Sequence, residues 1–340
     1  MNLSESELSM GNPGGVGMCK KTRVSLFTVL AVMFLTSCSQ LERRRSSKGV
    51  RGVIDSQQGV TFDQSNQGEE LPAEELEAKE PLPPPKVGLI LGPGGINTFA
   101  HLGVIKELSE SKVPIDMIVG IEWGALVGAL YASTGQIHKA QWEIYKLKDS
   151  DLPQKSMFSK KLTAQKVHQV LKKFSFKNIK ANVQFSCPSQ LIYSGSLKWQ
   201  KGHSLYDNTK RCMAFPPALE SEGGWVAQPF SLKQSIDYLR SRGAQIIIIS
   251  NVLGNSDILD RSVVKENVSA AVMWNQVRNT YNEFLQPENL KALGYKDVFV
   301  VHSSSIKGQI YDFSKRKTMA LKGQRAARPV VAAIIEQFGF

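Results

Sequence analysis

Several common functional signatures are missing from this sequence of 340 residues. It has only four cysteines and no C-x-x-C pair, so the usual cysteine-based metal sites are excluded. No internal repeat and no nucleic-acid recognition motif is evident. The glycine-rich run 92–95 lacks the Lys-Ser/Thr of a P-loop and the later acidic residue of a dinucleotide site. We therefore predict no cofactor, no metal site and no nucleic-acid partner.

Composition indicates a globular protein, because 42% of the residues are hydrophobic and 21% are charged. The net charge is +12, and much of it lies in two basic stretches, 155–180 and 315–328. Such stretches attract anions, including lipid headgroups. The simpler interpretation of these stretches is that they form a solvated basic surface with no specific ligand, as expected of a protein with a high isoelectric point.

The N-terminal residues have the order of a targeting segment. Lys20, Lys21 and Arg23 precede a mostly apolar run, 24–37, that is too short to span a bilayer. The run ends at Leu35-Thr36-Ser37-Cys38, which resembles a bacterial lipobox. This resemblance implies cleavage before Cys38 and acylation of its side chain. The alternative is an ordinary secretory signal with an incidental cysteine, and Met18 is a second candidate for the start of the chain.

We accordingly divide the chain into a lipoprotein signal peptide (1–37), a lipidated flexible tether (38–85) and a folded domain (86–340). The tether is rich in glutamate and proline, and little of it could form a core. Ser39 after the cysteine favours the outer membrane of a bacterial cell envelope, with the chain facing the periplasm. In that compartment Cys187 and Cys212 either form a disulfide or remain two buried thiols.

The folded domain alternates short apolar strands with helices across tight glycine turns, which predicts a parallel sheet covered on both faces. The expected strands are 87–91, 115–119, 246–250 and 298–301, and the expected helices are 98–111, 125–132, 231–242, 262–285 and 315–337. A kink in the last helix is possible at Pro329. We read residues 86–340 as a single α/β domain.

Three ordered blocks carry the candidate chemistry. The first is the glycine-rich segment 91–104, and the second is 120–132, which opens with Gly120-Ile121-Glu122-Trp123-Gly124. That pentapeptide has the frame of a nucleophile elbow, Gly-x-Ser-x-Gly, with glutamate in place of serine. The third block contains Phe215-Pro216-Pro217 and Glu222-Gly223-Gly224. Together the blocks resemble the patatin-like phospholipase family over residues 86 to about 252.

The resemblance implies a three-layer α/β/α domain with a mostly parallel central sheet. It also implies the site of a lipid acyl hydrolase, in which a Ser–Asp dyad and glycine-loop N–H groups act on an ester. The equivalent positions here are Glu122 for the serine and Glu222 for the aspartate. The positions equivalent to the oxyanion loop are Gly92, Gly94, Gly95, Asn97 and Thr98.

The same residues depart from the family pattern in three places. Glutamate replaces both members of the dyad, Asn97-Thr98 replaces Arg-Gly, and Pro93 replaces a glycine and has no N–H to donate. Loss of the nucleophile and of an oxyanion donor together removes most of the rate enhancement. We therefore predict a catalytically inactive pseudo-phospholipase that binds or scaffolds a lipid or an envelope protein. The alternative is a divergent acyl hydrolase that uses a non-standard site.

Glu122 and Glu222 leave several interpretations open. If the two carboxylates meet, one of them takes up a proton, or a cation lies between them. They could equally be capping or salt-bridging residues in a disused pocket, whereas acid–base work on a glycosidic bond has no other support in the sequence. Trp123 either fills the space that an acyl chain would occupy in an acyl hydrolase or is an ordinary core residue. His101 matches a position of the family's first block that is not catalytic.

Overall fold

The computed structural model describes residues 83–151, 163–174, 176, 183–202, 204–217, 219–221, 223–254, 268–303 and 313–340. The chain divides into two units, 1–77 and 78–340, and every described residue belongs to the second. The predicted signal peptide, Cys38 and nearly all of the tether lie outside the described residues. No helix of the described part of the chain is long and apolar enough to cross a membrane.

The domain is built on one mostly parallel sheet with the strand order β4-β3-β2-β1-β6-β7. Its parallel strands are β1 (Val87–Leu91), β2 (Met117–Gly120), β3 (Gln184–Leu191), β6 (Ile246–Asn251) and β7 (Val298–His302). Two short strands, β4 (Leu197–Lys201) and β5 (Trp225–Ala227), pair with β3 in the antiparallel sense. The prediction of a mostly parallel α/β sheet is confirmed.

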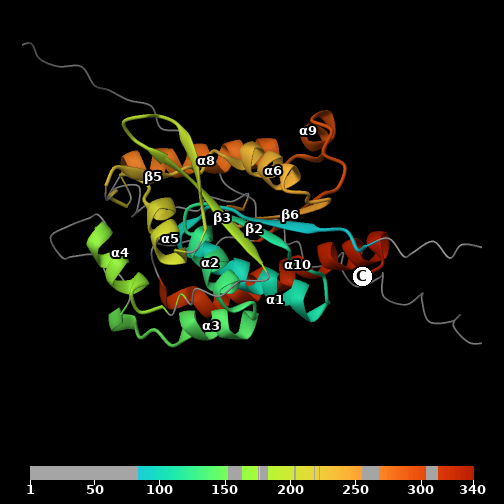
Figure 1. Ribbon diagram of the computed structural model, residues 1–340, viewed down its shortest axis with the longest axis horizontal. Helices are drawn as coiled ribbons and strands as arrows, with labels where there is room; N and C mark the ends of the chain where they lie inside the picture. Colours follow the sequence, from blue (N-terminus) through green and yellow to red (C-terminus); the bar gives the residue numbers. More distant parts are fainter. Residues whose placement is uncertain are drawn as a thin grey trace, which may run out of the picture. The chain divides into compact units, whose positions relative to one another are not determined.

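Helices cover both faces of this sheet (Figure 1). One layer contains α1 (Ala100–Glu110), α2 (Gly124–Thr134), α3 (Ile137–Tyr145), α4 (Ala164–Leu171), α5 (Leu205–Met213) and α10 (Arg316–Phe338). The other contains α6 (Leu232–Ser241), α8 (Val268–Phe284) and α9 (Pro287–Ala292). Leu89 and Leu91 of β1 pack into the first layer and Ile90 into the second, as strand alternation requires.

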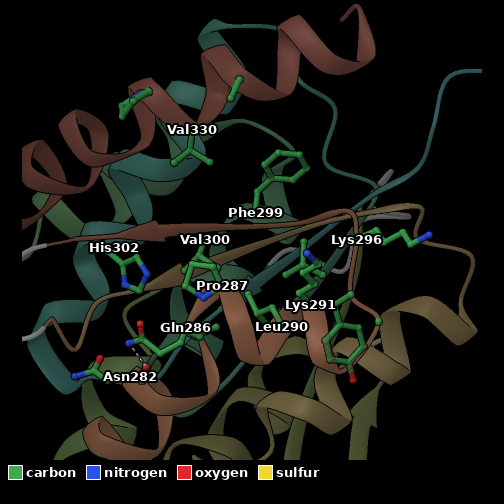
Figure 2. Close-up of a pocket in the computed structure, with 16 residues that line it drawn as sticks. Asn282, Gln286, Pro287, Leu290, Lys291, Lys296, Phe299, Val300, His302 and Val330 are labelled. Atoms are coloured by element: carbon green, nitrogen blue, oxygen red, sulfur yellow. Dashed lines mark hydrogen bonds between the residues drawn. The ribbon is translucent and has the colours of Figure 1, made fainter.

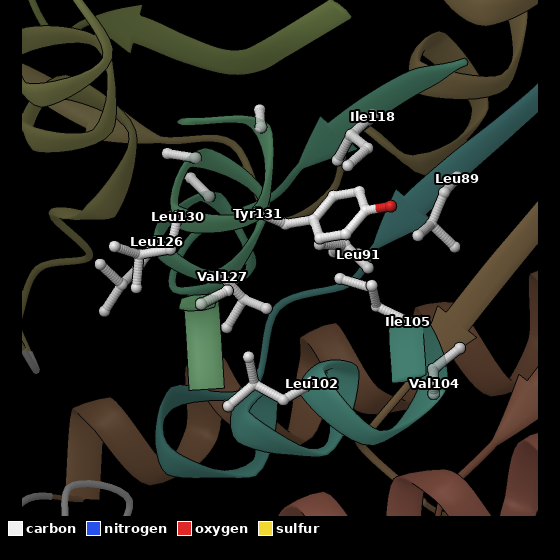
Figure 3. Close-up of a cluster of buried hydrophobic side chains, with 14 of the residues drawn as sticks. Leu89, Leu91, Leu102, Val104, Ile105, Ile118, Leu126, Val127, Leu130 and Tyr131 are labelled. Atoms are coloured by element: carbon white, nitrogen blue, oxygen red, sulfur yellow. The ribbon is translucent and has the colours of Figure 1, made fainter. Parts of the chain in front are cut away.

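The larger core lies between the sheet and helices α1 and α2. Figure 3 shows Leu89 and Leu91 of β1 in one apolar cluster with Ile105 of α1 and Val127 of α2. Every residue of α2 from Gly124 to Ser133 is buried, which explains why its sequence is apolar on all sides. Burial of α2 fixes the direction in which the chain leaves β2, and so it positions the turn between them.

Several element boundaries differ from the sequence prediction. The second strand begins at Met117 instead of residue 115, and just before it the Asp116 carboxylate accepts from Val87 N at 2.7 Å. Residues Gly95–Phe99 form a 3₁₀ turn before α1, and α10 continues through Pro329. Cys187 of β3 and Cys212 of α5 form a disulfide, which decides between the two alternatives left by the sequence.

Helices α1 and α10 touch through a pair of glycines. A Cβ atom at Gly103 would lie 1.8 Å from the carbonyl oxygen of Ala320, and one at Gly323 would lie 1.8 Å from that of Ala100. Both obstacles are helix backbone, which cannot move without displacing a whole element. The two helix axes can therefore approach this closely only because both positions lack a side chain.

We predict that Gly103→Ala destabilises the domain although alanine is the better helix former, because the added methyl meets backbone. The expected loss is about 1–3 kcal/mol in the free energy of unfolding, measured by chemical denaturation. Gly128→Ala in α2 is the matched control, because its Cβ would meet only side-chain atoms, at 3.0 Å. Equal effects of the two substitutions would contradict this account of the α1–α10 contact.

Candidate functional site

The elbow between β2 and α2 has the backbone geometry that its sequence frame predicts. Glu122 has φ +54°, in the left-handed region that residues other than glycine rarely adopt. A Cβ at Gly120 would lie 2.5 Å from Cα of Ala125, and one at Gly124 would lie 2.4 Å from the carbonyl oxygen of Leu91. Both glycines are therefore required by close backbone approach. The result is a sharp strand-to-helix turn with Glu122 at its apex.

The Glu122 carboxylate is bound by backbone N–H groups. Its Oε2 atom accepts hydrogen bonds from Gly94 N and Gly95 N, each at 3.1 Å, and the carboxylate also accepts from the N–H of Trp123. Glu122 lies one residue before Trp123, the N-cap of α2, where helix N–H groups and the helix dipole favour an anion. The side chain is 0% exposed. Glu122 thus occupies N–H donors that the family resemblance assigns to an oxyanion.

Only part of the predicted oxyanion loop takes part in this contact. Gly92 directs its N–H to Ser250 O at 3.0 Å, which extends the pairing of β1 with β6. Thr98 donates its hydroxyl to Gly95 O at 2.6 Å, and Asn97 N donates to Gly94 O at 3.0 Å. Gly92 and Thr98 therefore shape the loop, whereas Gly94 and Gly95 supply the donors. Asn97 is buried beside them, and its backbone N–H closes the turn.

Burial raises the pKa of Glu122 from 4.5 to about 7, and the three N–H donors only partly offset this effect. The second carboxylate oxygen, Oε1, is buried and has no hydrogen-bond partner among the described residues. The hydroxyl of Tyr281 in α8 is also buried and also has no hydrogen-bond partner among the described residues. Burial and the charge of Glu122 together raise the pKa of Tyr281 well above its ordinary value. No sequence motif pointed to Tyr281, because α8 follows the elbow by more than one hundred residues.

His101 links the glycine loop to β6. Its Nε2 lies 2.8 Å from Gly92 O and its Nδ1 lies 2.7 Å from Ser250 Oγ. A carbonyl can only accept, so Nε2 carries the proton and Nδ1 accepts from the Ser250 hydroxyl. Burial lowers the pKa of His101 to about 4, so the ring is neutral at physiological pH. The imidazole therefore holds the loop in place.

The remaining predicted site residues are distributed as follows. Glu222 and Cys38 lie outside the described residues, so neither the Glu122–Glu222 pair nor a cation between them is described. After Glu222, Gly223 and Gly224 have φ of +66° and +74° and lead into β5. Trp123 packs in the larger apolar core, which favours its reading as a core residue. The described residues contain no cluster of three or more His, Cys, Asp or Glu suited to a metal ion.

We predict that Glu122 makes stability depend on pH with a definite sign. Between pH 4.5 and about 7 the unfolded chain is ionised at Glu122 while the folded chain retains the proton, so stability falls as pH rises. Across this window Glu122→Gln should gain on the order of 3 kcal/mol relative to the unmodified chain. The measurement is the free energy of unfolding of both proteins at several pH values.

The lowered pKa of His101 gives the opposite slope between about pH 4 and 6.5, but this contribution is common to both proteins and cancels in their difference. A difference that stays constant from pH 4 to 8 would show that Glu122 has an ordinary pKa. In that case the carboxylate would be stabilised by its donors more fully than the buried geometry implies.

Comparison with known proteins gives the family of this domain. Residues 89–237 match the family model named Patatin-like phospholipase. Over 200 residues, 54% of this chain, the sequence is 24% identical to Patatin-like phospholipase domain-containing protein 6 of Mus musculus, of which it covers 14%. Over 218 residues, 59% of this chain, it is 26% identical to Neuropathy target esterase sws of Drosophila melanogaster, of which it covers 15%. The chain thus spans only a small part of either relative.

Among solved structures, VipD from Legionella pneumophila matches with a TM-score of 0.42 and 10% identity, over 74% of this chain and 67% of that one. The matched residues 89–237 contain the glycine loop, the elbow and the Gly223–Gly224 turn. The match over residues 89–237, the two curated relatives and the α/β/α fold together support the patatin-like phospholipase family for this domain.

Proposed function

We propose that this chain is a membrane-anchored member of the family that does not hydrolyse acyl esters and acts by binding a lipid or a partner protein. The observation that carries the proposal is the position of the Glu122 carboxylate on the N–H groups of Gly94 and Gly95. In an acyl hydrolase such donors must be free to receive the oxygen of the substrate carbonyl. Here they are already engaged by a side chain of the protein itself.

The rate argument points the same way. A carboxylate at the elbow cannot form the acyl-enzyme that a serine forms, and removal of such a nucleophile costs several orders of magnitude. The residual catalysis of mutated hydrolases comes from the oxyanion hole and from substrate binding. Occupation of Gly94 N and Gly95 N removes the first of these two sources. Binding without turnover is the function that remains.

A lipid ligand is supported by the named chemistry of the relatives, a phospholipase domain protein and an esterase. Membrane attachment is supported by the lipobox-like sequence that ends at Cys38. The disulfide between Cys187 and Cys212 is consistent with an oxidising compartment such as the periplasm. A structural role on anionic lipid, through the basic stretches, is the weaker variant of this proposal.

One observation favours the alternative of a divergent acyl hydrolase. The Ser250 hydroxyl donates to His101 Nδ1 at 2.7 Å, which is the contact that activates a serine nucleophile. However, both side chains are fully buried, and the neighbouring Gly92 N–H is engaged by Ser250 O. We therefore place this alternative second and include Ser250 in the test.

The activity test uses the purified chain and short- and long-chain acyl esters. We predict that neither the unmodified protein nor Glu122→Ala turns over ester above the buffer rate. Glu122→Ser restores an alcohol and frees Gly94 N and Gly95 N, so any gained activity should appear in this variant alone. Turnover by the unmodified protein that is lost in Glu122→Ala would contradict the proposal. Turnover lost only in Ser250→Ala would establish the alternative nucleophile.

The anchor is tested separately from the site. We predict that Cys38→Ala moves the protein expressed in a bacterial host from the detergent phase to the aqueous phase of a phase-partition experiment, because the acyl chains are lost. Metabolic labelling with a radioactive fatty acid should mark the unmodified chain and not the variant. Cys187→Ala is the control for general loss of a cysteine. Equal partitioning of all three proteins would rule out acylation at Cys38.

A further inference from the structure

A groove lies along the outer edge of the sheet, away from the elbow. It follows β7 and is bounded by the end of α8 and by α9 on one side and by α10 on the other, with a volume of about 1000 Å³ (Figure 2). Most of its wall is apolar, including Leu290, Phe299 and Val330. The volume of the groove is within the range of typical ligand sites, but the groove lies along an edge strand of the sheet.

The apolar wall is divided by the strand itself. Phe299 packs with the core layer of α1 and α10, whereas Val298 and Val300 pack with the layer of α6 and α8. In Figure 2, Phe299 and Val330 accordingly lie on one side of β7 and Val300 and Pro287 on the other. One acyl chain would fill only one side. An extended peptide alternates its side chains and so reaches both sides at once.

The backbone of β7 also favours a peptide. Ile247 N donates to Asp297 O and Ser303 N donates to Asn251 O, each at 2.9 Å, at the two ends of the β6–β7 pairing. In a parallel ladder the residues that bond to one neighbour alternate, so Phe299 and Val301 also face β6. The N–H and C=O groups of Val298, Val300 and His302 therefore face outward. No strand of the described part of the chain pairs with that edge.

Natural proteins protect such edges with proline, a bulge or an inward-pointing charge. The sequence of β7, Val-Phe-Val-Val-His, contains none of these, and its pairing with β6 is regular from Val298 to His302. The edge is thus competent for strand addition, the mode of peptide recognition in which main-chain bonds supply affinity and alternate side chains supply specificity.

The charge of the groove indicates one property of the added strand. Lys291 and Lys296 line it near the beginning of β7, and no acidic residue lines it. Both lysines are exposed, and neither has an ion-pair partner among the residues that the structure describes. The complementary peptide would carry acidic residues at the end that lies beside them.

We propose that the outer edge of β7 binds an extended segment of a partner protein. The segment adds a strand by pairing with Val298, Val300 and His302, places apolar side chains on both sides of β7, and directs acidic residues to Lys291 and Lys296. This site specifies the partner class for the binding role proposed above. The edge site shares no residue with the elbow. The edge proposal therefore does not depend on whether the elbow site hydrolyses esters.

The test begins with selection of random twelve-residue peptides displayed on phage against the Cys38→Ala chain. We expect the enriched peptides to have apolar residues at alternate positions and acidic residues at one end. The synthesised consensus peptide should bind the chain in a fluorescence anisotropy titration. Binding should weaken at least tenfold in Val300→Pro, because proline removes an outward N–H and leaves the β6 ladder intact. Val300→Thr keeps the N–H and is the matched control.

The electrostatic part is tested with Lys291→Glu combined with Lys296→Glu, which should also weaken binding at least tenfold. The remote, exposed Lys139→Glu should leave it unchanged. If Val300→Pro fails to fold, hydrogen exchange of the unmodified chain provides a second measurement. Addition of the peptide should then slow exchange of the Val298, Val300 and His302 amides.

Three results would overturn the proposal. The first is enrichment of no peptide, or equal binding of the peptide to Val300→Pro and to the unmodified chain. The second is a dimer that dissociates in Val300→Pro, observed by analytical ultracentrifugation, which would assign the edge to a second copy of the chain. The third is displacement of the peptide by a sixteen-carbon fatty acid whose own affinity is unchanged in Val300→Pro, which would assign the groove to lipid.

Discussion

The hydrogen bonds from Gly94 and Gly95 to the Glu122 carboxylate join the two turns at the centre of this fold. Strands β1 and β2 pair in parallel with Leu91 opposite Gly120, so the turns that follow the two strands lie at the same edge of the sheet. Each turn contains a glycine at a position where neighbouring atoms leave no room for a Cβ, and the absence of a side chain allows the turn to be tight. The carboxylate then lies where backbone N–H groups of both turns converge, and it fixes the loop relative to the elbow.

This contact explains how a charged residue can sit in the interior. A carboxylate without donors would be far too costly to bury, and three N–H groups with a helix N-terminus reduce that cost. They do not remove it, because Oε1 has no partner among the described residues and the pKa of Glu122 is raised to about 7. The left-handed backbone of Glu122 adds strain that the surrounding packing must hold. The site thus holds an internal anion within a strained strand-to-helix turn.

The same packing separates the interior of the sheet from its edge. At β1 and β2 helices cover both faces of the sheet, and His101 donates to the Gly92 carbonyl of the loop from within the domain. At β7 one row of backbone groups pairs with no strand of the described residues, and an apolar groove follows the same edge. The partner segment proposed above would add to the sheet at this edge, because backbone groups that pair with no described strand can accept one there.

Local patterns were sufficient to predict the central strands and the elbow. Val87–Leu91 and the isoleucine run of β6 are short, continuous apolar segments, and such segments are typical of buried parallel strands. Strand β3 was not predicted, because Pro188 and two serines interrupt its apolar pattern. Its polar groups are satisfied by distant residues, as when Gln200 donates to Ser189 Oγ at 2.9 Å.

The sequence by itself determined the resemblance to the family, the place of Glu122 at the elbow and the glycines around it, because these depend on residues close together in the chain. Only the tertiary structure decided that Gly94 and Gly95, and not Gly92, donate to the carboxylate, and that His101 holds Gly92 in place. It also brought Tyr281 near the elbow and placed β7 at an edge of the sheet with which no other described strand pairs. Hydrogen-bond partners and burial depend on which distant elements pack together, and a linear pattern does not specify that.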